Sequence, residues 1–323
     1  DDVIEQILKH FKLKIEESLT DYLSCQIRFK EERTKAWVGQ PHLLKSLEKK
    51  FGAKVRKNQK YRTPGTPGKG VIRPKEGDKT ISDEKQSEYR SGVGMLLYLI
   101  KHSRPDIANS VRELGKCNNG ATEAAYKELM RTIKFVLDTK WYGLKMVPTY
   151  NAKTGQWTIT IYTDSDWAGD KDNKISITGY IVFLMGVAVL WKSQAQRSVS
   201  LSSSEAEYYA LAEAAKDVKF VVQVLISMGI PVQLPVIIRV DNMGAIFMSQ
   251  NGSATSRTRH VDTRYHFVRE FVMSGFIKII FVRSADNVAD PFTKKVTGEV
   301  YESHVKEYVV DRDIFFAEDN HGQ

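Results

Sequence analysis

The chain has 323 residues, 42% of them hydrophobic, and a formal net charge of +9. No apolar run approaches the ~20 residues that cross a bilayer, and two cysteines without a CxxC motif support neither a disulfide framework nor a structural zinc site. We therefore expect an intracellular protein without a membrane partner. Its positive charge is consistent with an anionic partner such as nucleic acid.

The first 75 residues combine short regular elements with a basic linker. Apolar residues recur at helical spacing over residues 2–15, and "DYLSCQIRFKEERTKAWVG" predicts two strands joined by a charged turn. "QPHLLKSLEKKFG" predicts a helix with Pro41 in its first turn and Gly52 just beyond its end. The segment that follows, "KVRKNQKYRTPGTPGKGVIRPKEGDK", is basic and rich in proline and glycine, which predicts a linker or extended loop.

Residues 76–150 are predicted to form a small helical unit. Apolar positions recur at helical spacing throughout the stretch from about Glu84 to Leu144. Three segments carry this pattern: "EYRSGVGMLLYLIKHS", "RPDIANSVRELGKC" and "ATEAAYKELMRTIKFVLDT".

Residues 151–296 show the pattern of a mixed sheet with helices packed on it. "WTITIYTD" alternates apolar and polar residues, and "SITGYIVFL" and "VAVLWKS" follow, which predicts a meander of three strands. After a long helix, strands "PVIIRVD" and "FIKIIFV" alternate with helical segments, so we expect a mixed sheet with helices packed on it. For the chain as a whole we expect a multidomain α/β and α+β fold. In the tail, residues 297–323, we identify no chemistry.

The long helix begins near Ser204 and carries two glutamates, one residue apart. Glu207 heads an apolar stripe with helical spacing and should face the sheet, whereas Glu205 lies ~200° around the helix. Two interpretations of Glu207 are open on local grounds. It either forms a capping box with Ser204 or places a functional carboxylate near the strand ends.

Three aspartates, Asp164, Asp241 and Asp290, lie at the end of a predicted strand or shortly after one. Each taken singly is explained more simply as a turn or cap residue. Carboxylates that converge at one sheet edge repel one another unless a cation compensates them, and hard oxygen ligands indicate Mg²⁺ or Mn²⁺. Two such ions ~4 Å apart can activate a water and stabilise the leaving oxygen of a phosphodiester.

The order Asp, Glu, Asp, Asp over this series of elements resembles ribonuclease H. The motifs "YTDSDWAGD", "WKSQAQRSVSLSSSEAEYYAL", "VDNMGAI", "SRTRHVDTRYHFVRE" and "ADNVADPFTK" resemble the ribonuclease H of copia-type (Pseudoviridae) retrotransposon polyproteins. The resemblance implies a mixed five-stranded sheet with flanking helices and a two-metal endonuclease that cuts the RNA strand of RNA–DNA hybrids. The residues that match its catalytic, metal-binding carboxylates are Asp164, Glu207, Asp241 and Asp290.

The upstream half resembles the end of the reverse transcriptase of the same polyproteins. The hairpin "LTDYLSCQIRF" looks like the one near the primer terminus, and the helices that follow look like thumb and connection. The implied domains are the palm end with the start of the thumb and a basic linker (1–75), the thumb and connection (76–150), ribonuclease H (151–296) and a tail (297–323).

The polymerase motif Tyr-x-Asp-Asp does not occur, so we expect no DNA polymerisation by this chain alone. The resemblance implies an RNA–DNA hybrid as substrate. It names the rest of a reverse transcriptase, or a second copy in a homodimer, as further candidate partners. It also implies a location in cytoplasmic virus-like particles or in the nucleus.

Other polar residues near the predicted site are open to two interpretations. Four arginines on or just before the basic helix could contact phosphate, and a solvated helix face is the alternative. They are Arg257, Arg259, Arg264 and Arg269. The histidine that ribonucleases H often carry shortly before the last aspartate is missing between residues 275 and 290, since His260 and His266 lie further upstream.

We interpret Asp166 and Asp170 as solvent-facing residues of the turn after the first strand. The alternative to an active nuclease is a non-catalytic nucleic-acid-binding or assembly module derived from a retrotransposon. An integrase-like transposase would order its acids Asp, Asp, Glu, whereas the glutamate comes second here.

Overall fold

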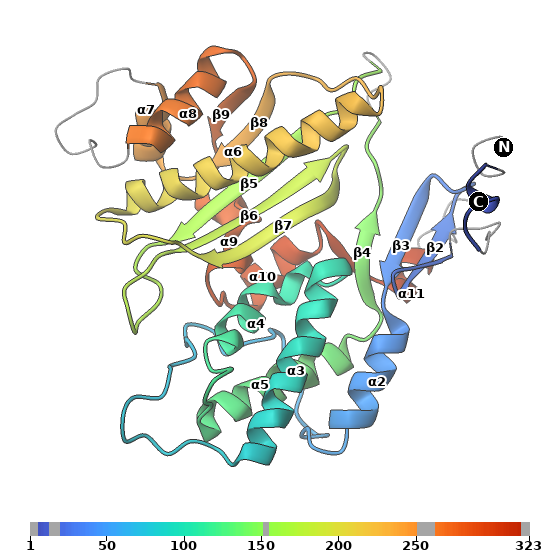
Figure 1. Ribbon diagram of the computed structural model, residues 1–323, viewed down its shortest axis with the longest axis vertical. Coiled ribbons are helices and arrows are strands. Elements are labelled where there is room, and N and C mark those ends of the chain that lie inside the picture. Colours follow the sequence, from blue (N-terminus) through green and yellow to red (C-terminus); the bar gives the residue numbers. More distant parts are fainter. Residues whose placement is uncertain (1–5, 13–19, 151–154, 251–261, 318–323) are drawn as a thin grey trace.

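The computed structural model describes residues 6–12, 20–150, 155–250 and 262–317, and it contains two five-stranded sheets with helices on both sides of the second sheet (Figure 1). The mixed α/β class predicted from the sequence is therefore confirmed. Of the predicted N-terminal helix, residues 2–15, the structure describes only residues 6–12.

The first sheet is antiparallel throughout and joins the two ends of the described chain. It contains the predicted hairpin, whose strands pair Gln26 with Gly39 across the charged turn. Its strands, in spatial order, are β1 (Asp21–Tyr22), β2 (Cys25–Lys30), β3 (Lys35–Gly39), β4 (Tyr142–Met146) and β10 (Val309–Asp311).

The segment predicted as the first strand of the hairpin forms two strands, β1 and β2, which a turn at residues 23–24 separates. Two further strands of this sheet were not predicted. The helical pattern expected to continue to Leu144 ends earlier, because α5 stops at Asp138 and Tyr142–Met146 pairs with β3 as a strand. The tail contributes Val309–Asp311, which pairs antiparallel with β4. Both strands form through partners far away in the sequence, and local periodicity does not encode such pairing.

The helices of the predicted helical unit are confirmed. Ser82 and Thr122 cap two of its helices by accepting hydrogen bonds from the backbone of Lys85 (3.4 Å) and Ala125 (3.2 Å). The unit contains α3 (Asp83–His102), the 3₁₀ turn η1 (Pro105–Ile107), α4 (Ala108–Gly115) and α5 (Glu123–Asp138). The helix predicted in the first 75 residues, α2 (Pro41–Phe51), packs against this unit.

The second sheet is the predicted mixed sheet. Three antiparallel strands form the meander, and two further strands lie parallel to its first strand on the other side. In spatial order the strands are β7 (Val187–Ala195), β6 (Ile177–Leu184), β5 (Ile159–Asp166), β8 (Val236–Val240) and β9 (Ile277–Phe281).

Helices cover both faces of this sheet. The long helix α6 (Ser203–Ser227) crosses one face, where its apolar stripe packs on Ile159 and Ile161 of β5 (Figure 1). Residues Ile181 and Phe183 of β6 point to the opposite face. The remaining helices are α7 (Met243–Gln250), α8 (Asp262–Met273), η3 (Ser284–Asp286), α9 (Asp290–Thr293), α10 (Gly298–Val305) and α11 (Arg312–Ala317).

One hydrophobic core connects segments from all four predicted domains. It includes Val71 of the linker, Leu96 of α3, Phe183 of β6 and Tyr308 of the tail. The indole of Trp191 also donates a hydrogen bond to the backbone oxygen of Ile100, at 2.9 Å. The helical unit is thus packed against the second sheet, while the exact domain boundaries stay a prediction.

Across the described residues, every helix is too short or too polar to cross a bilayer.

A buried ion pair fixes the turn between α3 and α4. Arg104 and Asp106 are both almost fully buried, and the guanidinium makes two hydrogen bonds of 2.8 Å to the carboxylate. The backbone oxygen and hydroxyl of Thr139 accept two more bonds from Arg104, and Tyr301 of α10 donates to Asp106 at 2.9 Å. This network ties α10 to the helical unit.

We expect Asp106→Ala to lower the free energy of unfolding by roughly 3–5 kcal/mol, because it leaves the buried guanidinium of Arg104 without its partner. Denaturant unfolding followed by circular dichroism measures this loss. Glu302→Ala is the control, since it removes an exposed bidentate pair with Arg62 and should change stability little. Equal losses in the two variants would contradict the assigned role of the network.

Candidate active site

Asp164 lies on β5 near the end of the strand, and the neighbouring strand allows a helix to approach it. It pairs with Gly179 of β6 across the sheet. A Cβ atom at Gly179 would lie 2.5 Å from Thr293 and 2.8 Å from Phe292. Glycine is therefore required for α9 to pack this closely, and the contact lets the Thr293 hydroxyl donate a hydrogen bond to Asp164.

Glu207 lies on the first turns of α6 and points to the sheet, as its position in the apolar stripe predicted. Its Oε1 accepts hydrogen bonds from the backbone and the hydroxyl of Ser165, both at 3.0 Å. The capping residue is Ser202 rather than Ser204, and it accepts from the backbone of Glu205 at 3.2 Å. Glu205 in turn accepts from the backbone of Leu201 at 2.7 Å. The contacts at the start of α6 are therefore made by Glu205, while Glu207 bonds to Ser165 of β5.

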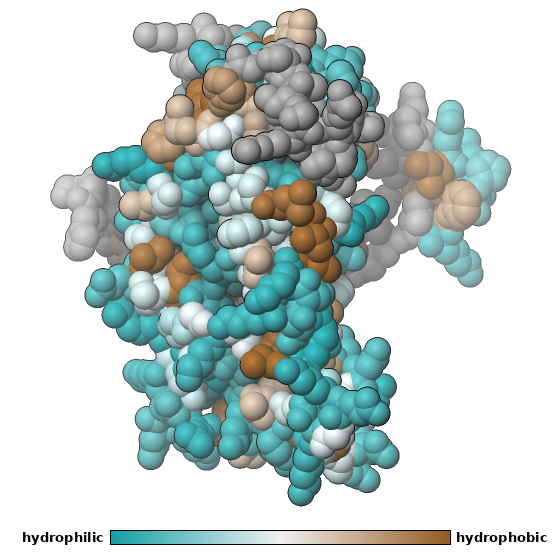
Figure 2. Space-filling model, turned by 90° about the vertical axis from the view of Figure 1, so that its left-hand side faces the viewer, coloured by the Kyte–Doolittle hydropathy of each residue, from teal (hydrophilic) through white to brown (hydrophobic). Residues whose placement is uncertain are grey.

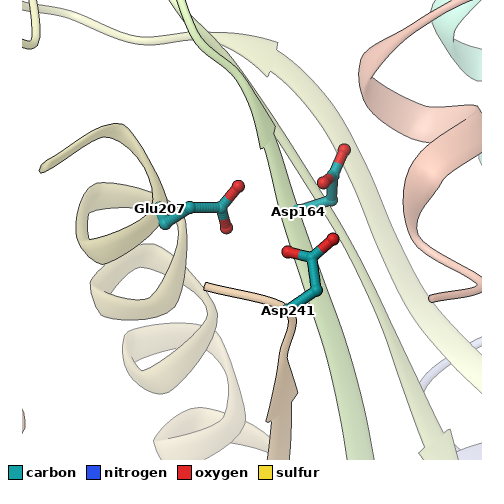
Figure 3. A group of neighbouring side chains, drawn as sticks. All are labelled: Asp164, Glu207 and Asp241. Atoms are coloured by element: carbon teal, nitrogen blue, oxygen red, sulfur yellow. The ribbon is translucent and has the colours of Figure 1, made fainter. Parts of the chain in front are cut away.

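Asp241 follows β8 directly and completes a group of three acids. One carboxylate oxygen each from Asp164, Glu207 and Asp241 lies within 4.8 Å of the other two. Figure 3 shows Glu207 extending from α6 toward the two aspartates on the neighbouring strands β5 and β8. The structure thus brings together three of the four predicted acids at one edge of the sheet.

Asp290, the fourth predicted acid, begins α9 and lies beside Asp164 rather than within the group of three. Its Oδ1 is 3.1 Å from the ammonium of Lys294, and the same ammonium is 3.9 Å from Oδ2 of Asp164. Lys294 therefore supplies a positive charge shared by two of the acids.

Burial and mutual repulsion change the protonation of these groups. Burial, followed by the charges of Asp290 and Asp241, raises the pKa of Asp164 from 3.8 to about 7, although Lys294 opposes the shift. Burial and the charge of Asp164 likewise raise the pKa of Glu207 well above its ordinary value. Burial is also the largest cause of the raised pKa of Asp290.

The donor set fits a hard divalent cation. It consists of carboxylate oxygens alone, and the Oε2 of Glu207 is buried without a hydrogen-bond partner among the described residues. A buried carboxylate oxygen without a partner is costly, and a cation bound by the acids would compensate it. The site is compatible with divalent metal binding.

The chain is similar to known polyproteins over most of its length. It is 33% identical over 226 residues to the retrovirus-related Pol polyprotein from transposon RE1 of Arabidopsis thaliana, covering 70% of this chain and 15% of the relative. It is 31% identical over 279 residues to the Pol polyprotein from transposon TNT 1-94 of Nicotiana tabacum, covering 84% of this chain and 20% of the relative. The chain belongs to the copia-type retrotransposon Pol polyproteins.

The chain spans only a fifth or less of the length of these relatives. No family model matches it. The solved structure of LC11-RNase H1, isolated from compost by a metagenomic approach, is 16% identical, with a TM-score of 0.34 over 46% of this chain and 98% of that chain. Family membership therefore rests on the sequence relatives.

The interpretation of Asp166 and Asp170 as solvent-facing turn residues is wrong. Strand β5 continues to Asp166, and burial raises the pKa of that carboxyl group. Asp170 is only 1% exposed, with its carboxylate 3.0 Å from Arg73 and 3.2 Å from Lys116. These cations come from the linker and from the end of α4, so local sequence around Asp170 gives no sign of them.

Three residues that support the acids were missed in the sequence. The amide of Asn287, fully buried, donates to the backbone oxygen of Thr163 at 2.9 Å and so holds the turn before α9 against β5. Thr293 and Lys294 contact Asp164 as described above. All three lie in the motif "ADNVADPFTK", so the motif itself was the available signal.

The predicted phosphate-binding arginines are only partly described. Arg257 and Arg259 lie outside the described residues, and of Arg264 only the backbone, in α8, is described. Arg269 is half-buried, and its Nε donates to the backbone oxygen of Met248 at 3.4 Å. His260 also lies outside, while His266 is exposed on α8.

We expect the melting temperature of the metal-free parent to fall relative to that of Asp164→Asn as the pH rises from about 4 to about 7. The folded state holds the Asp164 proton up to a pKa of about 7, whereas the unfolded chain releases it near 3.8. The folded state therefore binds more protons in this window, and its stability decreases with pH. Asparagine cannot ionise and removes this contribution.

Differential scanning fluorimetry in a chelator at several pH values measures both curves. Glu48→Gln, which removes an exposed carboxylate on α2, is the control and should follow the parent. Parallel curves for the parent and Asp164→Asn would contradict the assigned environment of this carboxyl group.

Proposed function

We propose that this segment is a ribonuclease H that cuts the RNA strand of RNA–DNA hybrids within a retrotransposon reverse transcriptase. The observation that carries the proposal is the convergence of Asp164, Glu207 and Asp241 from β5, α6 and β8. Three acids that repel one another lie together at one sheet edge, which is expected of a site that works with bound cations. Membership of the Pol polyproteins supports a nuclease of this class.

The proposed cofactors are two Mg²⁺ or Mn²⁺ ions, held by Asp164, Glu207, Asp241 and Asp290. Such ions, when bound, activate a water and stabilise the leaving oxygen of the phosphodiester. The role of the protein is to hold the acids in position.

The contacts described above serve this role. Ser165 fixes one oxygen of Glu207, and Thr293 fixes Asp164. Lys294 keeps a positive charge beside Asp164 and Asp290, where the phosphate of a substrate would approach the acids.

The proposed substrate and partners follow from the same assignment. The net charge of +9 favours binding to the phosphate backbone, with Arg257, Arg259, Arg264 and Arg269 as candidate contacts. We assign residues 1–75 to the palm end, thumb start and linker, 76–150 to thumb and connection, 151–296 to ribonuclease H and 297–323 to a tail. The remaining reverse transcriptase or a second copy is the proposed protein partner.

We expect Glu207→Gln to reduce Mg²⁺-dependent cleavage of a labelled RNA–DNA hybrid by more than about 100-fold, since even indirect supports of metal ligands cost 10–100-fold. Hybrid binding should persist, because the basic surface is unchanged. Gel electrophoresis of the cleaved RNA measures the rate. Glu205→Gln, one residue away on the same helix, is the matched control and should retain activity.

If the parent binds the hybrid but does not cut it, the chain is instead a non-catalytic nucleic-acid-binding module. If Glu205→Gln were inactive and Glu207→Gln active, the division of roles between the two glutamates would be wrong.

Mg²⁺ should raise the melting temperature of the parent, because an ion that binds only the folded state stabilises it by about 2.7 kcal/mol at 100 times its Kd. The double variant Asp164→Asn, Asp241→Asn should melt higher than the parent without metal, since repulsion is relieved. It should also lose the response to Mg²⁺. Thermal melts with and without Mg²⁺ test both effects, and a double variant that still responds as the parent does would exclude these acids as ligands.

A further inference from the structure

The linker between α2 and α3 is docked onto the protein at three points. The backbone and hydroxyl of Thr66 both donate to the carboxylate of Glu128 on α5, each at 2.8 Å. The backbone of Val71 donates to Glu113 on α4, also at 2.8 Å. Beyond it, Arg73 binds Asp170 of the β5–β6 loop. The predicted linker is therefore a fixed part of the surface on this stretch.

Between the first two points the linker makes a tight turn that presents Lys69. The backbone of Lys69 donates to the oxygen of Thr66 at 3.1 Å, with Pro67 and Gly68 at the centre of the turn. Gly68 has a φ of +67°, which proline at the preceding position and glycine here accommodate in a type II turn. The backbone of Gly68 also donates to the oxygen of Lys295, which follows α9 in the chain, at 3.0 Å. The turn is thus attached beside α9.

This turn forms one wall of a cleft of about 470 Å³ that reaches Asp290. The opposite walls come from α4, the β5–β6 loop and the segment that starts with α9, and the lining includes Asp290, Thr293 and Lys294. The side of the molecule that bears the linker and the start of α6 faces the viewer in Figure 2, where its lower part is largely hydrophilic.

Most cations in the cleft are already paired, but two are not. Arg112 lies 2.9 Å from Glu113, and Lys295 lies 2.6 Å from Glu128. Lys69 and Lys171 are exposed in the cleft and make no ion pair within the described part of the chain. The cleft is therefore lined by two uncompensated positive charges, one from the linker and one from the β5–β6 loop.

We propose that this cleft binds the phosphate backbone of the nucleic acid next to the cleavage position, with Lys69 and Lys171 as the phosphate-binding residues. The proposal rests on the proposed function, because the cleft leads directly to Asp290 and Lys294. Phosphate is the ligand that suits two free ammonium groups beside a site for a phosphodiester. The upstream linker thus completes the substrate surface of the downstream sheet.

The test measures hybrid affinity without divalent cations, so that no cleavage occurs, over a series of salt concentrations. Each lysine that neutralises a phosphate contributes about 0.7–0.9 to the slope of log K against log salt. The variant Lys69→Ala, Lys171→Ala should therefore lower the slope by about 1.4–1.8. The control is Lys57→Ala, Lys174→Ala, which removes one exposed lysine from each of the same two segments outside the cleft and should keep the parent slope.

A second pair of variants separates the position of Lys69 from its charge. Gly68→Ala strains the turn at its positive φ and should weaken binding although Lys69 is retained. Gly77→Ala introduces the same kind of strain in the same linker, because Gly77 has a φ of +87°. An added Cβ atom there has no other atom within 4 Å, and Gly77 lies away from the cleft. This variant should bind as the parent does.

Equal slopes for the cleft variant and its control overturn the inference, and Mg²⁺-dependent cleavage by the parent would then leave the proposed function intact. If the cleft variant shows the expected loss of slope but the parent never cuts the hybrid, the cleft inference stands and the proposed nuclease function is wrong. If the parent shows no salt-dependent affinity for the hybrid, both the phosphate-binding cleft and the proposed function are wrong.

Discussion

Repulsion between buried carboxylates is the constraint on which the architecture of the second sheet depends. Asp164, Glu207 and Asp241 come from three different elements, and each must be held against the charge of the others. Ser165 anchors one of them, and the approach of α9 over Gly179 brings a hydroxyl and an ammonium to another. The packing of α6 and α9 on the two faces of the sheet therefore holds these carboxylates in position against their mutual repulsion.

The helical unit and the linker add to this arrangement because they share a core with the sheet. Phe183 of β6 packs in the same cluster as Leu96 of α3, so the two units keep a fixed relation. Asp170 shows the consequence, since the cations that pair with this buried carboxylate come from the linker and from the end of α4. Residues that are about a hundred positions apart in the sequence, such as Arg73 and Asp170, are thus in direct contact.

The structure could be predicted from the sequence where the local residue pattern and the packing agree. The alternation of Ile159 and Ile161 predicted β5, and helical spacing placed Glu207 on the buried face of α6. Prediction failed where partners are distant. Nothing local indicates that Tyr142–Met146 is a strand, because its partner β3 lies about a hundred residues earlier, and the buried state of Asp170 depends on Arg73 in the same way.

The pairing of β10 with β4 has a consequence for handling this protein. Val309–Asp311 covers the hydrogen-bonding groups of β4 that would otherwise form an open sheet edge. Unpaired edges are templates for pairing with other chains, which leads to aggregation. A truncation directly after α9, at Thr293, would expose β4 and favour insoluble material, even though every acid of the site would still be present.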